Sequence, residues 1–186
     1  MYRNYQKDYH TLFGNAFGEA AGANNEAGLY LGLRTSLTGQ LLFEGYADFF
    51  RHNWLRFLVD APSRGTEYFA KLTYSPTRST ELYLRMKHES KQRNTPDNET
   101  AIDYLTYHKK SSVRLHLAKR MSYNLTLRSR VEFSFFNTDQ QEEIEHGYLL
   151  YQDIIYSFPR FPLRLSGRFA IFETAFSGIL PGRVRR

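Results

Sequence analysis

The sequence has no cysteine, no long apolar run and no recognisable export signal at its start. Without cysteine there can be no disulfide framework and no thiolate metal site. No apolar run approaches the roughly 18 residues that a membrane-spanning helix requires, which excludes helical membrane proteins but leaves β-barrels open. The opening run MYRNYQKD lacks the basic, then apolar, then small-residue order of a secretory signal. Either the protein stays inside the cell or, as we expect, a preceding part of a longer protein supplies the export signal.

Motifs of catalysis and cofactor binding are also missing. The six histidines show no pair at metal-ligand spacing, and there is no HExxH motif. The Gly-x-Ser-x-Gly, P-loop and dinucleotide-binding patterns do not occur. The acidic stretch 139–145 could hold a cation, but carboxylates among glutamines are more typical of a solvated loop. We therefore expect no enzymatic activity, no cofactor and no bound metal.

Positive charge and aromatic residues are abundant. The 186 residues include 25 Lys and Arg against 19 Asp and Glu, which gives a net charge of +6, and they include 14 Tyr and 15 Phe. A basic chain suits an anionic partner without saying which one. Aromatic residues favour strands, and they also suit the interface between a membrane and water.

Apolar and polar residues alternate along most of the chain, which is the pattern of β-strands with two different faces. In one segment Leu125 and Leu127 share one face, whereas Arg128 lies on the other. In another, Leu149 and Leu150 are adjacent, and we assign Leu150 to the apolar face. The eight alternating segments are 28–37, 40–50, 66–74, 81–89, 113–117, 124–135, 148–158 and 163–172. The sequence therefore predicts an all-β fold, an antiparallel up-and-down meander of about eight strands.

Short and long connections alternate between these segments. Short ones such as 38–39 and 119–123 are turns. Long ones span 51–65, 90–110 and 137–147. All turns therefore lie at one end of the sheet and all loops at the other. Bacterial outer-membrane barrels have this asymmetry, with short periplasmic turns and longer extracellular loops, so we predict that the strands are part of such a barrel.

Basic residues on the polar faces are the candidate functional residues. They are Arg34, Lys71, Arg85, Lys87, Arg114, Arg128, Arg130, Arg164 and Arg168. In a barrel they would line a water-filled lumen and favour anionic or phosphorylated solutes, or they would pair with carboxylates and fill the lumen without conduction. The sequence thus predicts an outer-membrane protein, a channel or uptake component with a basic lumen, whose partners are membrane lipid and anionic solutes.

A soluble β-domain that binds nucleic acid or another polyanion through the same arginine-rich face is the alternative. The two interpretations predict opposite burial. In a membrane barrel, Leu115, Leu127 and Phe133 face lipid, whereas Arg128 and Arg130 face water inside. In a soluble domain, the same apolar side chains form a core and the arginines form an accessible patch.

Several runs are similar to a known family of proteins. They are YHTLFGNAFG (9–18), NEAGLYLGL (25–33), WLRFLVDAPS (54–63), ELYLR (81–85), LRSRVE (127–132) and GYLLYQD (147–153). They resemble the C-terminal barrel-like region of large Bacteroidota envelope proteins that usually carry helix-hairpin-helix repeats upstream. The resemblance implies an exported outer-membrane protein and assigns no activity. Because this chain contains no helix-hairpin-helix motif, the resemblance gives no support to DNA binding.

We expect the chain to divide into three parts. Residues 1–27 should be a loop-rich segment made of the end of a preceding strand and an extracellular loop, and residues 28–172 should be the barrel strands. Residues 173–186 lose the alternation and lack the aromatic-ended last strand that outer-membrane barrels typically show. We therefore expect an irregular tail on a truncated barrel.

Overall fold

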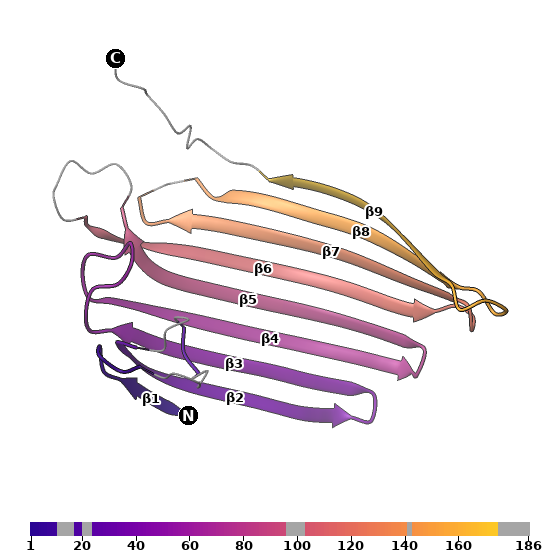
Figure 1. The fold of residues 1–186 in the computed structure, drawn as a ribbon, viewed down its shortest axis with the longest axis horizontal. Helices are drawn as coiled ribbons and strands as arrows, with labels where there is room; N and C mark the ends of the chain where they lie inside the picture. Colours follow the sequence, from indigo (N-terminus) through magenta and orange to yellow (C-terminus); the bar gives the residue numbers. More distant parts are fainter. Residues whose placement is uncertain (11–16, 20–23, 96–102, 141–142, 175–186) are drawn as a thin grey trace, which may run out of the picture.

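The computed structural model describes residues 1–10, 17–19, 24–95, 103–140 and 143–174, which form one antiparallel sheet (Figure 1). Its nine strands are β1 (Tyr2–Tyr5), β2 (Glu26–Thr38), β3 (Leu41–His52), β4 (Ser63–Thr77), β5 (Thr80–Asn94), β6 (Leu105–Arg120), β7 (Leu125–Thr138), β8 (Glu145–Ser157) and β9 (Arg164–Thr174). The order in the sheet follows the order in the chain. The all-β up-and-down meander predicted from the sequence is confirmed, with the short β1 as an addition to the expected strands. In the described ranges, no helix has the length and apolar character needed to cross a membrane.

The sheet is open along both outer strands. Among the described strands, β1 pairs only with β2, and β9 pairs only with β8. β1 also covers only part of β2, from the pair Tyr2–Leu29 to the pair Tyr5–Glu26. Unpaired backbone groups along such edges can pair with further strands. That these strands belong to a closed barrel stays a prediction.

Short turns lie at one end of the sheet and longer connections at the other, and Figure 1 shows the turns on the right. The predicted loop 90–110 is shorter than expected, because β5 and β6 continue pairing as far as Asn94 and Leu105. This extension includes polar pairs such as Lys91 with His108. Backbone pairing needs no apolar face, so an alternation pattern misses a strand end that is polar on both sides.

Strand bounds also differ slightly from the predicted division of the chain. The expected N-terminal segment 1–27 contains β1 and the first two residues of β2, and β9 extends two residues past the expected limit at 172. Residues 175–186 of the predicted tail lie outside the described residues. Asn25, which precedes β2, has a φ of 54°, a conformation that asparagine tolerates better than most residues. Its side chain donates to the Trp54 carbonyl (2.8 Å) and accepts from the Trp54 amide (2.9 Å), which fixes the start of β2 to the β3–β4 connection.

One face of the sheet, here called the apolar face, is exposed. It includes Leu29, Leu31, Leu33, Phe49, Tyr68, Leu72, Leu84, Met86, Leu115, Phe133, Leu150, Ile154, Phe169 and Ile171. Leu33 is 60% exposed and Leu115 is 48% exposed. No second layer of the described chain covers these side chains.

The opposite face, here called the charged face, is the better buried one. It carries the nine candidate cations together with carboxylates such as Glu26, Asp48 and Asp153, all three of which are buried. In the described part of the chain, twelve polar or charged residues are buried but only five hydrophobic ones. The buried residues of this sheet are therefore mostly polar or charged, whereas those of a soluble domain with an apolar core are mostly hydrophobic.

Candidate functional site

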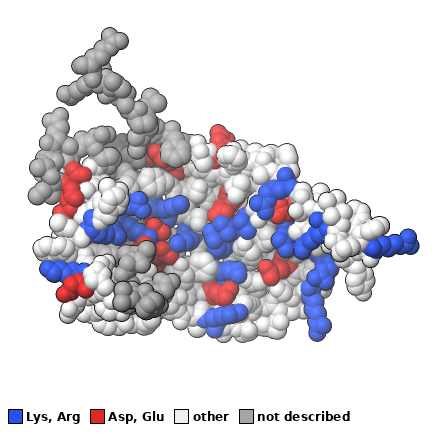
Figure 2. All heavy atoms as spheres, in the orientation of Figure 1, with Lys and Arg blue, Asp and Glu red and all other residues white. Residues whose placement is uncertain are grey.

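All nine predicted basic residues lie on the charged face, where Figure 2 shows a band of cations and carboxylates. One row runs across β2 to β7 and contains Arg34, Glu44, Lys71, Arg85, Arg114 and Glu132. Lys87 lies on the loop side of this row, and Arg130, Arg128, Arg168 and Arg164 lie on the turn side. The described sheet is open, so the lumen that they were predicted to line stays a prediction.

Ion pairs join the cations of the central row across neighbouring and alternate strands. Glu132 accepts from Arg114 Nε and Nη2 at 2.8 and 2.9 Å, and from Arg85 Nη2 at 3.3 Å. Arg85 reaches Glu132 past the whole width of β6. Glu44 is shared by Lys71 (3.3 Å) and Arg34 (3.4 Å). Every cation of the row therefore has an ion-pair partner, although four cations share two carboxylates.

A second cluster lies at the loop end, and sequence reasoning missed it. Arg3 of β1 binds both carboxylate oxygens of Asp48, at 2.8 and 3.0 Å, and also donates to Glu26. Glu26 is 0% exposed, accepts from the Glu19 amide at 2.9 Å, and lies 3.7 Å from His52 Nε2. Burial by itself raises the pKa of Glu26, but His52, Arg3 and the Glu19 amide outweigh it and lower the pKa to about 2.

This cluster had only a partial signal in the sequence. Extending the alternation backwards from Tyr30 puts Glu26 on the polar side of the same strand. Nothing comparable marks Arg3, because β1 has only four residues and lies far from Glu26 in the sequence.

Lys91 forms a further group at the loop end with three carboxylates. Its ammonium lies 2.9 Å from Glu89 and 3.9 Å from Glu67, and it also pairs with Glu19. Burial lowers the pKa of Lys91, but Glu19 and Glu89 outweigh that effect and raise it. Lys87 joins through Glu67 at 2.9 Å. Lys87 and Lys91 are thus held by nearby acids.

On the turn side of the charged face, Tyr151 of β8 packs against two arginines. Its ring is buried and lies against two guanidinium groups, with the Arg130 and Arg168 carbons 4.8 and 4.3 Å from the ring centre. Arg168 also binds both oxygens of Asp153, at 2.6 and 2.9 Å. By contrast, Arg128 and Arg164 form no ion pair with any described residue. The turn end therefore holds basic side chains that form no ion pair with a carboxylate of the described residues.

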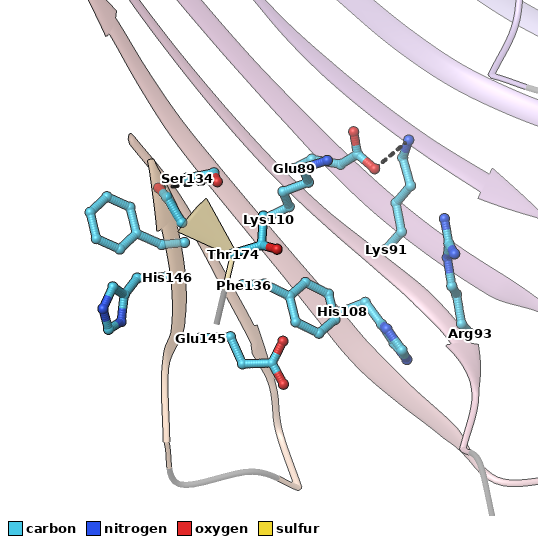
Figure 3. A pocket seen from close by; sticks show the side chains of 12 residues that line it. Glu89, Lys91, Arg93, His108, Lys110, Ser134, Phe136, Glu145, His146 and Thr174 are labelled. Atoms are coloured by element: carbon cyan, nitrogen blue, oxygen red, sulfur yellow. Dashed lines mark hydrogen bonds and ion pairs between the residues drawn. The ribbon is translucent and has the colours of Figure 1, made fainter. Parts of the chain in front are cut away.

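A pocket of about 460 Å³ opens at the loop end and is lined by residues of β5 to β9 (Figure 3). Arg93, His108 and Lys110 line it beside the ion pair of Glu89 with Lys91. Burial, followed by the charge of Arg93, lowers the pKa of His108. These groups favour an anion, but the pocket contains no arrangement specific to one reaction.

Features that would indicate catalysis or metal binding were also sought. His88 Nδ1 lies 2.9 Å from Ser111 Oγ, which brings a base and a hydroxyl together on the apolar face. In the described part of the chain, no carboxylate or amide hydrogen-bonds the other ring nitrogen, as the orienting group of a catalytic triad would. None of the described His, Asp and Glu residues form a group of three or more suited to hold a metal ion.

Comparisons with known proteins return no matching protein-family model, no matching curated protein and no matching solved structure. The similarity to the barrel-like region of Bacteroidota envelope proteins therefore stays a prediction.

Proposed function

We propose that this chain forms part of an outer-membrane β-barrel, in which the apolar face contacts lipid and the charged face lines a basic, water-filled lumen. The barrel serves as a channel or uptake component for anionic solutes. One observation carries the proposal: apolar side chains are exposed on an uncovered face, while charged side chains bury one another on the opposite face.

The distribution of charge on the apolar face supports the lipid contact. Within β2–β8 this face contains no Asp or Glu, and its Lys and Arg occur only near strand ends: Arg51, Arg64 and Lys109 by the loops, and Lys119 by the turns. A Lys or Arg at the bilayer midplane costs about 2–4 kcal/mol, and the cost falls towards the interfaces. The cations therefore stand where lipid headgroups would be.

Strand length and aromatic residues agree with the same orientation. β2 to β9 contain 11 to 16 residues, and about 9–11 tilted residues cross the hydrocarbon layer. On the apolar face, Tyr74 and Tyr156 lie towards the turns, and Phe49, Tyr68 and Tyr148 lie towards the loops. Aromatic rings favour both interfaces of a membrane.

The soluble alternative receives less support. It requires Leu115 and Phe133 to lie in a core, yet both are about half exposed, at 48% and 49%. Soluble monomers rarely leave an apolar patch of this extent in water.

Fractionation of cells that express the native gene product tests the proposal. We expect the protein in outer membranes, released only by detergent. Purified protein reconstituted into lipid vesicles should admit a small anionic solute faster than a cationic solute of equal size, because cations exceed acids on the charged face. Recovery without detergent, together with salt-sensitive binding to nucleic acid, would favour the soluble alternative instead.

A further inference from the structure

Two adjoining hollows lie at the turn end of the charged face, away from the loop-end clusters. One, of about 330 Å³, is lined by Arg78 from the β4–β5 turn and by Arg120 of β6. The other, of about 470 Å³, reaches Arg168 of β9. Arg128 of β7 and Arg164 of β9 line both hollows. We call the two hollows together the turn-end groove, and Figure 2 shows basic side chains projecting at this end.

Most cations of the turn-end groove have no ion-pair partner among the described residues. Arg128 lies directly across from Asp153 in the register, but both oxygens of Asp153 are hydrogen-bonded to Arg168 on the other side. Glu81 is the other carboxylate of the groove, and it forms no ion pair with a described residue. Arg78, Arg120 and Arg164 likewise form none among the residues that the structure describes. The groove therefore carries four unpaired guanidinium groups and one unpaired carboxylate.

Most strand cations elsewhere on the charged face differ from those of the groove, because they have acid partners. On the loop side, Lys87 and Lys91 each contact at least two carboxylates, and Arg3 contacts two. In the central row, Glu132 serves both Arg85 and Arg114. Apart from Arg93 and Lys110, which line the loop-end pocket and form no ion pair with a described residue, the described strand cations on the loop side and in the central row of this face each have an acid partner. Unpaired guanidinium groups that line the same hollow repel one another unless an anion lies between them.

The side chains that line the turn-end groove indicate which class of anion it would bind. A guanidinium fork matches the geometry of phosphate and binds it through two parallel hydrogen bonds. Hydroxyl groups of Ser79, Thr126 and Ser166 line the same hollows and add neutral donors. A volume of some hundreds of Å³ suits a small solute rather than a polymer.

We propose that the turn-end groove binds a small phosphate-bearing solute, held between Arg128 and Arg164. The assignment rests on the proposed function for its setting, since the charged face then lines a lumen and the groove lies at the periplasmic mouth. It adds to that function a fixed binding site and a chemical class of solute.

Calorimetric titration of the full-length chain in detergent micelles with inorganic pyrophosphate tests the site. Arg128→Gln and Arg164→Gln should each weaken binding about tenfold or more, because each removes a charged hydrogen-bonding partner. Arg128→Lys keeps the charge but not the fork, so it should give a smaller loss. Arg51→Gln is the matched control, since Arg51 is an exposed arginine on the apolar face, at the opposite end, without an ion pair in the described chain. It should leave binding unchanged.

Equal losses in all three Gln variants would overturn the proposal, because they would indicate general attraction to a basic protein. Failure of the wild-type chain to bind pyrophosphate would overturn it as well, as would binding only to vesicles that contain anionic lipid, since the ligand would then be a headgroup. Insertion into neutral vesicles is measured separately. Insertion without pyrophosphate binding rejects the site alone, and pyrophosphate binding by a chain that does not insert rejects the proposed function alone.

Discussion

At the scale of single residues, Glu26 shows how this protein keeps a charge without access to water. Its carboxylate is surrounded by Arg3, His52 and the Glu19 amide, and it lies at the loop end of the charged face. Replacement of such a carboxylate removes an acceptor from the buried Arg3 guanidinium, whose remaining partner is Asp48. Removing one partner of a buried ion pair usually lowers the free energy of unfolding by more than the intact pair contributed, because the other charge is left buried without a partner.

The pKa of Glu26 gives the first prediction. Because the pKa falls from the ordinary 4.5 to about 2 on folding, the ionised group stabilises the fold fully above about pH 4.5 and loses this effect as the pH falls towards 2. We expect Glu26→Gln to lower the free energy of unfolding by on the order of 3 kcal/mol near neutral pH. Urea unfolding in detergent micelles should show this difference shrinking below about pH 4.5. A difference that is constant with pH would contradict it.

Glu132 gives the second prediction. It compensates both Arg85 and Arg114, so Glu132→Gln leaves two half-buried guanidinium groups with weaker acceptors. We expect a loss of about 1–3 kcal/mol in the free energy of unfolding, measured in the same way. Glu81→Gln removes an equal charge from an exposed carboxylate without an ion pair in the described chain, and should change stability by less than about 0.5 kcal/mol. Equal effects of the two variants would show that net charge, and not the pairing, matters.

At the scale of strands, Gly65 determines how β3, β4 and β5 approach one another. It lies opposite Phe50 of β3 and Lys91 of β5. A Cβ atom here would lie 2.5 Å from the Phe50 ring and 3.0 Å from the Ser90 carbonyl oxygen. Phe50 is one of the few buried apolar residues, so its ring has little freedom to move away.

The third prediction follows from this contact. Gly65→Ala should destabilise the protein by about 1–3 kcal/mol, because the added methyl group overpacks the site. Gly39→Ala is the control, since a Cβ in that turn would meet no atom within 4 Å. Thermal unfolding of both variants in detergent separates them: Gly39→Ala should unfold near the wild-type temperature and Gly65→Ala below it. The reverse order would disprove this account of the β3–β4–β5 contact.

Sequence alone predicted the long strands well where one face is apolar and the other polar. Leu150 was assigned to the apolar face despite its apolar neighbour Leu149, and the register places it there, opposite Val131. The loop ends of β5 and β6 were missed because both of their faces are polar, and β1 was not foreseen as a complete strand because it is so short.

The candidate site was less predictable than the strands. A period of two shows which side chains share a face, but not which cation reaches which acid. Pairings such as Arg85 with Glu132 cross an intervening strand, and they depend on strand register and on side-chain reach. That Arg128 stays unpaired follows from Asp153 binding Arg168 through both oxygens, which no spacing in the sequence reveals.

At the scale of the whole molecule, the two faces of the sheet make opposite demands on their surroundings. Burying a Leu, Ile or Phe side chain contributes about 1.5–3 kcal/mol, so the exposed apolar face represents a large unrealised stabilisation in water. The charged face needs no covering layer, because much of its charge is paired within the sheet. Lipid on one side and water on the other would satisfy both faces.

Adjacent leucines in β8 provide a whole-molecule test of this arrangement. Leu150 points out of the apolar face between Tyr148 and Gln152, and is 41% exposed. Leu149 points to the charged face, where it lines a hollow of about 480 Å³ together with Glu89 and Glu132. An arginine at 149 therefore finds space, water and carboxylates, whereas an arginine at 150 would face hydrocarbon.

We expect Leu150→Arg to reduce the fraction of protein that inserts into lipid vesicles, at a cost of about 2–4 kcal/mol if position 150 lies near the bilayer midplane and less towards an interface. Leu149→Arg should insert nearly as well as the wild type. Protection from added protease, with the vesicles intact, measures insertion for both variants. Both make the same change of residue one position apart, so differences in expression or net charge cannot explain a contrast between them. Equal insertion of the two variants, or greater loss with Leu149→Arg, would mean that the apolar face does not contact lipid, and that a second protein layer covers it instead.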